Sequence, residues 1–471
     1  MSSRLSVRLF VALILAIVLA GAIMFFLPAQ QPERLALAVF FVTVIAWTLT
    51  PFDRTAVALV AALTLVLGGA VTEENFYRSL GHPLIWLLFG AFVIAAALAE
   101  IQLAERLARV ALRPARNVTR LFYALTLMIA VTAFMIPSTT GRAAFLLPVF
   151  LTLSGSIANA AITRAMSIHF PSIILLSACG SLIGAGAHLV AIDMMREIGR
   201  APGAYRPNMT FMEWTTLGLP FALVSSLLAT FVILQLFLNR EQRALPLAFP
   251  DNVVPPRLTG REIYILVVVA MTILLWLTQA VHGVEVAIVT LCSAIAVSVA
   301  SPSGKSMKQT FREVDWNLLL FVAGASLIGE ALIDTNAAGE IMQGFVSMVN
   351  GASNHPVLVV GLVSLVALLG HLVITSRTAR ATVLIPLIAL PLAQFGYNST
   401  AVIFLIAVAS GYCLTLTISA KSLLIYSNPT GASFSHGELL RLSGILLPLH
   451  LALLVVFAMF IWPQLGLPLL K

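Results

Sequence analysis

Long apolar runs follow one another along the chain, each bounded by proline, glycine or charged residues. A helix needs about 20 apolar residues to cross a bilayer. About eleven runs approach or exceed that length: 8–27, 34–50, 55–71, 83–100, 170–195, 213–238, 262–281, 283–301, 314–333, 398–427 and 438–463. The pattern predicts an all-α polytopic membrane protein with about eleven transmembrane helices.

Two further apolar stretches, 118–153 and 355–395, are too long for one crossing, and a polar cluster interrupts each of them. Broken backbone at membrane depth is tolerated only where it is buried in protein or lines water. We therefore expect each stretch to enter the membrane and return as a re-entrant helical hairpin.

The two polar clusters share one motif. Met-Ile-Pro-Ser-Thr-Thr-Gly-Arg ends at Arg142 and Val-Ile-Thr-Ser-Arg-Thr-Ala-Arg ends at Arg380. A constant offset of 238 residues also pairs Ser138 with Ser376. Repetition at a fixed offset indicates that one half of the chain is a duplicate of the other.

The duplication organises the chain, 1–471, as a single transporter domain. An N-terminal helix over 1–33 precedes repeat 1 at 34–238, and a cytoplasmic linker at 239–261 leads to repeat 2 at 262–463. Corresponding helices are about five crossings apart, and an odd shift inverts the second half. We expect an inverted repeat, as in many secondary transporters.

Composition and charge agree with a membrane location. The chain is 60% hydrophobic and 10% charged, against roughly 25% charge in soluble domains. Its net charge of +8 lies mostly in short loops, which indicates topology rather than nucleic-acid binding. The basic segment 101–120 places the N-terminus in the cytoplasm, although the loop with Arg196, Arg200 and Arg206 falls on the opposite side.

The first run, 8–27, follows two arginines and could also be a signal peptide, but its length favours an uncleaved spanning helix. We expect a multi-pass protein of the inner membrane.

Basic residues deep in apolar runs are the strongest chemical signal. Arg142, Arg377, Arg380 and Lys421 would each cost about 2.5 to 3.5 kcal/mol in hydrocarbon. They therefore need water, a counter-charge or an anionic ligand. The polar clusters also precede new helices, whose free N–H groups favour anions. We predict an anion site formed by Ser138, Thr139, Thr140, Ser376, Arg377, Thr378 and Lys421.

Alternatives remain for several of these residues. A serine in such a cluster could simply cap a kinked helix. Arg142 and Arg380 could equally form pairs that stabilise the protein.

Two more helix breaks, at 180–188 and 415–422, concentrate glycine, serine and threonine and suggest unwound backbone. A lone histidine such as His188 is more typical of packing than of proton transfer. Possible supporting or coupling residues are Arg142, Arg380, Gly184, His188, Thr375, Thr417, Ser419 and Ser422.

Other chemistries lack a pattern in this sequence. Cys179, Cys292 and Cys413 are far apart, without the spacing of a metal site or a disulfide framework. Hydrolase and metalloprotease motifs are missing, and the polar clusters offer arginine where a nucleophilic serine would need a base. We therefore expect no enzyme, and these residue patterns by themselves indicate no certain metal or cofactor.

With these motifs the chain resembles the divalent anion:sodium symporter family, the dicarboxylate, citrate and sulfate transporters of the ion transporter superfamily. The likeness rests on Trp-Leu-Leu-Phe-Gly-Ala-Phe at 86–92, Trp-Asn-Leu-Leu-Leu-Phe at 316–321 and the paired clusters with their downstream Leu-Pro and Ile-Pro. It implies a homodimer with a fixed scaffold, in which both hairpins and the two broken helices move as an elevator.

The resemblance also implies sodium sites, near Ser138, Gly184, Thr375 and Ala420. Members of the family typically show Ser-Asn-Thr at both hairpin tips, and this chain lacks both asparagines. Positive charge at Arg377 and Lys421, and a titratable His188, stand where relatives would hold sodium. We expect sodium coupling to be weakened or lost.

These observations predict a secondary active transporter of small divalent anions, foremost C4-type dicarboxylates. The alternatives are a carrier of sulfate or another oxyanion, a dicarboxylate exchanger, a proton-coupled carrier, or an anion sensor that does not transport. The expected partners are the anion, the lipid bilayer and a second copy of the chain.

Overall fold

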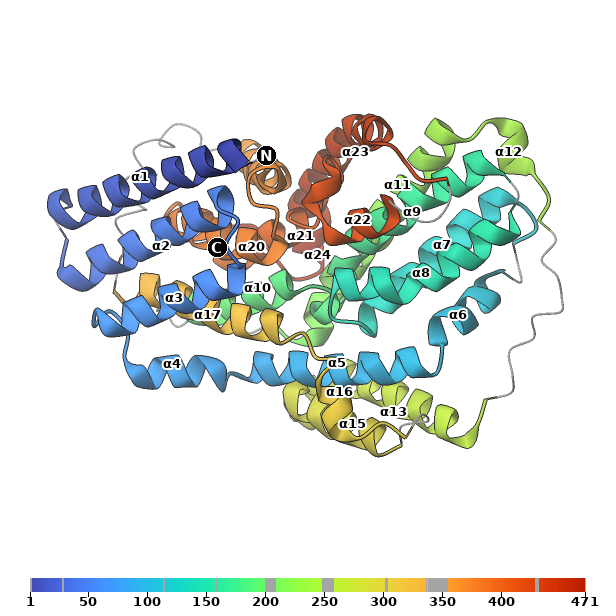
Figure 1. Cartoon of the computed structure of the whole chain (residues 1–471), viewed down its shortest axis with the longest axis horizontal. Coiled ribbons are helices and arrows are strands. Elements are labelled where there is room, and N and C mark those ends of the chain that lie inside the picture. The colour runs from blue at the N-terminus through green and yellow to red at the C-terminus, as the bar shows by residue number, and fades with distance from the viewer. Residues whose placement is uncertain are drawn as a thin grey trace.

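A computed structural model describes residues 2–27, 29–112, 115–157, 159–199, 209–247, 258–300, 304–335, 337, 355–427 and 432–470. Over these ranges the chain is all-helical (Figure 1), which confirms the predicted class. The described ranges leave out Arg200 and Arg206 and part of the predicted linker. They also leave out most of the segment between the predicted helix 314–333 and the predicted hairpin 355–395.

The chain begins with six helices: α1 Ser2–Phe26, α2 Gln31–Leu49, α3 Arg54–Leu67, α4 Glu73–Leu80, α5 Pro83–Glu100 and α6 Leu103–Leu112. Local sequence fixes where they start. The Asp53 carboxylate caps α3 by accepting from the N–H groups of Thr55 and Ala56, both at 3.0 Å. Pro83 opens α5, where its missing N–H costs nothing.

The first polar cluster and the first break follow. Their elements are α7 Val118–Val131, the 3₁₀ turn η1 Thr132–Phe134, α8 Thr139–Ser156, α9 Ala160–Ser177, the 3₁₀ turns η2 Ala178–Gly180 and η3 Leu182–Gly184, α10 Gly186–Gly199, α11 Phe211–Phe237 and α12 Arg240–Ala244. A helix, a polar break and a second helix thus occupy the stretch predicted as the first hairpin.

The second half repeats this order. Its elements are α13 Gly260–Leu277, α14 Gln279–His282, α15 Val286–Val299, α16 Met307–Phe311, α17 Trp316–Asp334, α19 Pro356–Leu369, η4 Gly370–Leu372, α20 Arg377–Gln394, α21 Ser399–Ala409, η5 Thr417–Ser419, α22 Lys421–Ser427, α23 His436–Val456, the π-helical turn η6 Phe457–Ile461 and α24 Trp462–Gln464. The 3₁₀ turns η1 and η4 are as far apart in the sequence as the two copies of the repeated motif.

Eight helices in the described part are long and apolar enough to cross a membrane, and five shorter apolar helices accompany them. One predicted boundary is wrong, because the helix expected to start near residue 170 starts at Ala160. The first ten residues of this helix, α9, are too polar to be recognised as part of a span, and some of them contact other parts of the protein.

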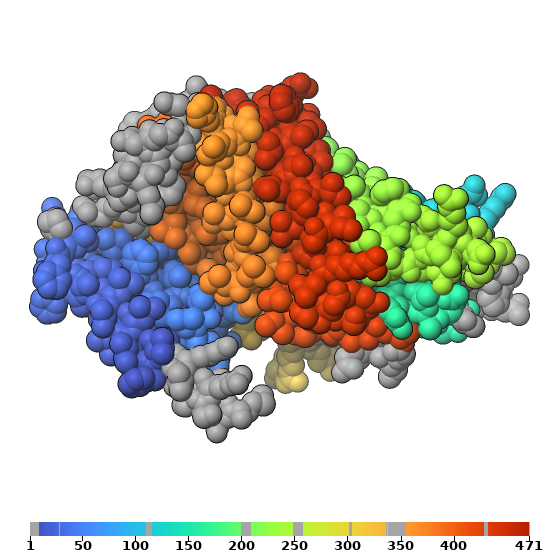
Figure 2. Space-filling view, turned by 90° about the horizontal axis from the view of Figure 1, so that it is seen from above, coloured from blue at the N-terminus to red at the C-terminus, as the bar shows by residue number. Residues whose placement is uncertain are grey.

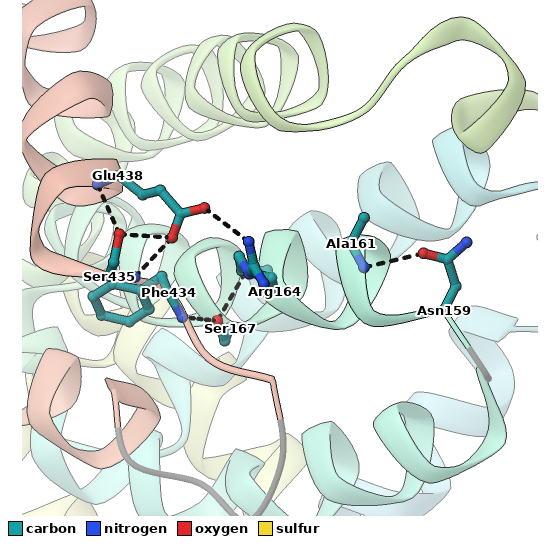
Figure 3. A network of polar contacts seen from close by, with 7 residues as sticks. All are labelled: Asn159, Ala161, Arg164, Ser167, Phe434, Ser435 and Glu438. Atoms are coloured by element: carbon teal, nitrogen blue, oxygen red, sulfur yellow. Dashed lines mark hydrogen bonds and ion pairs between the residues drawn. The ribbon is translucent and has the colours of Figure 1, made fainter.

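These partners are seen in Figure 3. Ser167 accepts a hydrogen bond from the Phe434 N–H at 2.9 Å, and Arg164 lies 3.6 Å from Glu438 at the start of α23. The polar start of α9 is therefore held against the chain that leads into α23.

Two helix pairs each join one helix of the first half to one helix of the second half. Helix α5 lies against α15 and α17 lies against α3. A Cβ on Gly90 would lie 2.8 Å from a Thr290 side-chain carbon, and one on Gly324 would lie 3.1 Å from the Ala58 backbone. Glycine at both crossings lets the helices approach closely.

The helices that follow the two breaks also pack against helices of the other half of the chain. Helix α10 packs against α20 and α17, whereas α22 packs against α8 and α9. The Tyr426 hydroxyl donates to the Ala143 carbonyl at 3.1 Å, which ties α22 to α8. Each second helix of a polar cluster therefore lies beside the broken helix of the other half. Helices α19 and α23 lie side by side on one face (Figure 2).

Candidate functional site

Both polar clusters begin a helix with a capping serine. The Ser138 hydroxyl accepts from the Gly141 N–H at 3.2 Å, and the Ser376 hydroxyl accepts from the Ala379 N–H at 3.2 Å. The capping alternative therefore holds for both copies. Each hydroxyl keeps its own proton and a second lone pair, so capping leaves room for a ligand. Thr139 and Thr140 are partly exposed beside Ser138.

Arg142 is fully buried and its hydrogen bonds hold three elements together. Nη2 donates to the Ile129 carbonyl at 2.6 Å and to Ser177 Oγ at 2.8 Å. Nη1 donates to the Ile174 carbonyl at 2.9 Å and Nε to Thr132 Oγ1 at 3.0 Å. The carbonyls belong to the last turns of α7 and α9, where a helix dipole favours a cation.

Arg380 holds the second cluster in a matching way. Its Nη1 donates to the Ile374 carbonyl at 3.2 Å, and its Nη2 donates to the Ser410 carbonyl and to Cys413 Sγ. The expectation that every buried arginine needs water, a counter-charge or a ligand is wrong for Arg142, because backbone carbonyls satisfy it. Both residues join a cluster to the end of the next helix.

Arg377 behaves differently, because it reaches from the start of α20 into the space between α10 and α21. Its Nη2 lies 2.8 Å from His188 Nε2 and 3.5 Å from the Ala407 carbonyl. The guanidinium also packs against Gly411, where an added Cβ would lie 2.8 Å from Nη2. A side chain at this position would therefore displace the guanidinium from where it lies.

The remaining donors of Arg377 are unused. Its Nε and Nη1 are buried and have no hydrogen-bond partner among the residues that the structure describes. A buried charge without partners is costly, whereas a paired and hydrogen-bonded one is tolerated. An anionic group beside Arg377 would complete this set of donors.

His188 positions this guanidinium. Arginine can only donate, so His188 Nε2 must accept, and Nδ1 must carry the proton that it shares with the Ser181 carbonyl at 3.1 Å. The neutral imidazole packs against Trp214 with ring centroids 4.9 Å apart and the ring planes tilted by 37°. Trp214 in turn donates to the Cys179 carbonyl at 3.0 Å. The geometry assigns His188 to orientation of Arg377.

Glycines shape the first break. A Cβ on Gly184 would lie 2.1 Å from the Ala178 carbonyl oxygen, and one on Gly186 would lie 3.2 Å from Thr378 Oγ1. Gly186 therefore brings the start of α10 against the second cluster, close to His188 and Arg377.

Gly184→Ala is expected to destabilise the protein by about 3 kcal/mol, because the new methyl group overlaps backbone that cannot move freely. Thermal unfolding in detergent measures this effect. Gly155→Ala is the matched control, since a Cβ there has nothing within 4 Å. Equal melting temperatures of the two variants would contradict the assignment.

The other predicted residues fall into two groups. Ser419 and Ser422 are buried, with hydroxyls unpaired within the described ranges, and Thr417 is partly exposed nearby. Lys421 starts α22 with an exposed side chain, so the expectation of a lysine buried in an apolar span is wrong. The residues around Lys421 are largely apolar, so hydropathy did not indicate that a helix begins at this position.

One residue of the site was missed. The Arg54 guanidinium donates to the Thr375 hydroxyl, immediately before the second capping serine. Arg54 lies at the boundary of an apolar run, where an arginine looks like a loop residue. Only its contact with a segment 321 positions away gives it a place in the site.

The two places where sodium was expected have different surroundings. The Ala407 carbonyl, which could bind a cation at the α21 break, already faces Arg377 at 3.5 Å. The Thr375 hydroxyl, at the same expected place, already accepts from the Arg54 guanidinium. Near Ser138 and Gly184 the break offers the buried Ser181 hydroxyl, which has no partner among the described residues.

Comparison with known proteins gives the family of the chain. A sequence profile of the family described as CitMHS, citrate transporter, matches residues 42–411. The chain belongs to the citrate transporter family. The predicted resemblance to divalent-anion carriers is thereby confirmed, and so is the class of membrane transporters.

Individual relatives of this citrate transporter family member are distant. The sodium-dependent dicarboxylate transporter SdcS of Staphylococcus saprophyticus is 25% identical over 397 residues, which cover 76% of this chain and 74% of the relative. A membrane protein of Cupriavidus necator is 23% identical over 95% of this chain and 91% of its own length. The YdaH transporter of Alcanivorax borkumensis has a similar fold, with a TM-score of 0.57, 14% identity and coverage of 94% and 100%.

Proposed function

We propose that the protein is a secondary active transporter of small divalent anions, foremost C4-type dicarboxylates, and that Arg377 binds a substrate carboxylate. The observation that carries this proposal is the buried Nε and Nη1 of Arg377, which lack partners in the described structure. Guanidinium binds carboxylate with strong, charge-assisted hydrogen bonds. Capped helix starts at Ser138 and Ser376 add N–H groups that favour negative charge.

Two observations support elevator-type transport on an inverted repeat. Both halves contain the same order of helix, break and helix, and each second cluster helix packs on the broken helix of the other half. The reciprocal pairs α5 with α15 and α3 with α17 would form a scaffold. We propose that the two clusters, α9, α10, α21 and α22 move against it, in a homodimer of the inner membrane with a cytoplasmic N-terminus.

Sodium coupling is expected to be weak or lost, because Arg377 supplies a permanent positive charge beside the second break. Uptake of labelled succinate into proteoliposomes should therefore change less than about twofold when external sodium is replaced by N-methylglucamine at clamped voltage. Strict dependence on sodium would overturn this part of the proposal. Accumulation itself separates a carrier from a sensor, which binds without accumulating.

Proton coupling is the alternative with its own structural support. The rings of His371 and His450 lie 6.0 and 5.3 Å from the ring of Tyr412, all three side chains being buried. His371 Nε2 and His450 Nδ1 have no partner in the part of the chain described. An inward proton gradient that drives succinate accumulation would favour this mechanism. Uptake that requires preloaded dicarboxylate would indicate exchange instead.

The substrate itself is tested by thermal stabilisation. Ligands that bind the folded state raise its melting temperature with concentration. Succinate, malate, citrate and sulfate compared in one series would rank the dicarboxylate proposal against the oxyanion alternative. Stabilisation by sulfate alone would overturn the choice of dicarboxylates.

A further inference from the structure

Arg54 is the first residue of α3, and its backbone is held firmly. Asp53 caps the helix, and the Arg54 carbonyl accepts from Trp47 Nε1 at 3.2 Å. Trp47 packs in turn on Phe321 of α17, with ring centroids 5.3 Å apart. The half-buried Arg54 side chain therefore projects from a well-supported position on the pair α3 and α17.

The guanidinium of Arg54 reaches the second polar cluster, where it donates to the Thr375 hydroxyl. Thr375 is two residues from Arg377, a separation of at most about 7 Å along the backbone. Two arginines from separate parts of the fold thus converge on one turn. This turn also contains the capping Ser376.

A neutral hydroxyl is a weak partner for Arg54. The hydroxyl accepts a hydrogen bond but carries no counter-charge, whereas a carboxylate supplies the opposite charge and can accept two parallel N–H bonds from the guanidinium. A carboxylate that arrives at the turn would therefore displace Thr375 from Arg54. The neighbouring Asp53 carboxylate attracts Arg54 through its charge, while its Oδ1 accepts from two backbone N–H groups at the start of α3.

We propose that Arg54 is a second substrate-binding residue, which takes one carboxylate of a dicarboxylate while Arg377 takes the other. This inference rests on the proposed function and narrows it. Two permanently charged cations that reach one turn in this structure select a dianion with separated charges over a monocarboxylate. Arg54 then discriminates between substrate classes, whereas Arg377 binds any carboxylate.

The test measures binding of succinate and of butyrate to the full-length protein in detergent. Arg54→Gln is expected to raise the Kd of succinate by about ten- to hundredfold, the effect of losing a charged hydrogen bond, and to leave butyrate within about twofold. Arg78→Gln is the matched control, because Arg78 is exposed and pairs with Glu74 on α4.

Thr375→Val separates ligand binding from a purely structural contact. The variant frees Arg54 from its hydroxyl partner, so the proposal predicts succinate affinity that rises by about two- to tenfold. A structural contact predicts that Thr375→Val and Arg54→Gln weaken binding alike. That result, or an Arg54→Gln protein with unchanged succinate affinity, would overturn the inference.

Failure of the proposed function has a different signature. Wild-type protein and Arg78→Gln would then bind neither succinate nor citrate, whatever residue occupies position 54. Wild-type binding of succinate together with an unaffected Arg54→Gln variant refutes the second binding residue alone.

Discussion

Replacing Arg377 with glutamine is expected to abolish dicarboxylate binding while the ligand-free protein stays about as stable as wild type. Each hydrogen bond to a charged group contributes about 1.5 to 3 kcal/mol, so the loss of two weakens binding more than a hundredfold. Stability changes little for a physical reason. The variant loses the contact with His188 Nε2, but it also loses a buried charge with unpaired Nε and Nη1.

Thermal unfolding with and without succinate measures both quantities in one experiment. Arg164→Gln is the matched control, because Arg164 is half exposed and lies 3.6 Å from Glu438, away from the polar clusters. It should keep the full succinate-induced shift. An Arg377→Gln protein that still responds to succinate like wild type would refute the assignment of Arg377 to the substrate.

Replacing Arg142 with methionine is expected to have the opposite profile, a loss of stability of about 4 kcal/mol. The guanidinium donates to two helix-end carbonyls and two hydroxyls in a fully buried position. Each buried acceptor left without a donor costs about 1 to 3 kcal/mol. Lysine should not rescue the protein, because one ammonium cannot reproduce the planar fork of four bonds.

The loss should appear as a melting temperature lower by on the order of 10 °C, or as failure to accumulate in the membrane. Arg380→Met should be milder, because Arg380 Nε already lacks a partner among the described residues. An Arg142→Met protein with wild-type stability would show that the carbonyls of α7 and α9 are satisfied by other means.

Much of the helix arrangement follows from hydropathy. The runs that predict helices over 83–100, 213–238 and 314–333 match α5, α11 and α17 closely. The physical reason is that lipid leaves a spanning segment few options besides an apolar helix. Prediction fails at the start of α9, where Ser167 and Arg164 contact the segment that leads into α23 and the start of that helix.

The residues of the candidate site were also predicted only in part. Repetition of the polar motif identified Ser138, Ser376 and Arg377 without any structure. It also favoured Arg377 over Arg142 and Arg380 as the substrate contact. It left the role of Arg142 and Arg380 open, because that role depends on which helix ends their guanidinium groups reach. The exposure of Lys421 and the contact of Arg54 with Thr375 also depend on segments that are distant in sequence.

The sequence by itself determined the all-helical membrane class, the duplicated halves and the two polar breaks, because these depend on local hydropathy and on a repeated motif. Tertiary structure alone decided which arginine is satisfied and which is left with free donors. That choice depends on carbonyls at the ends of α7, α9 and α21, and a helix end becomes a partner only when folding brings it within hydrogen-bond distance.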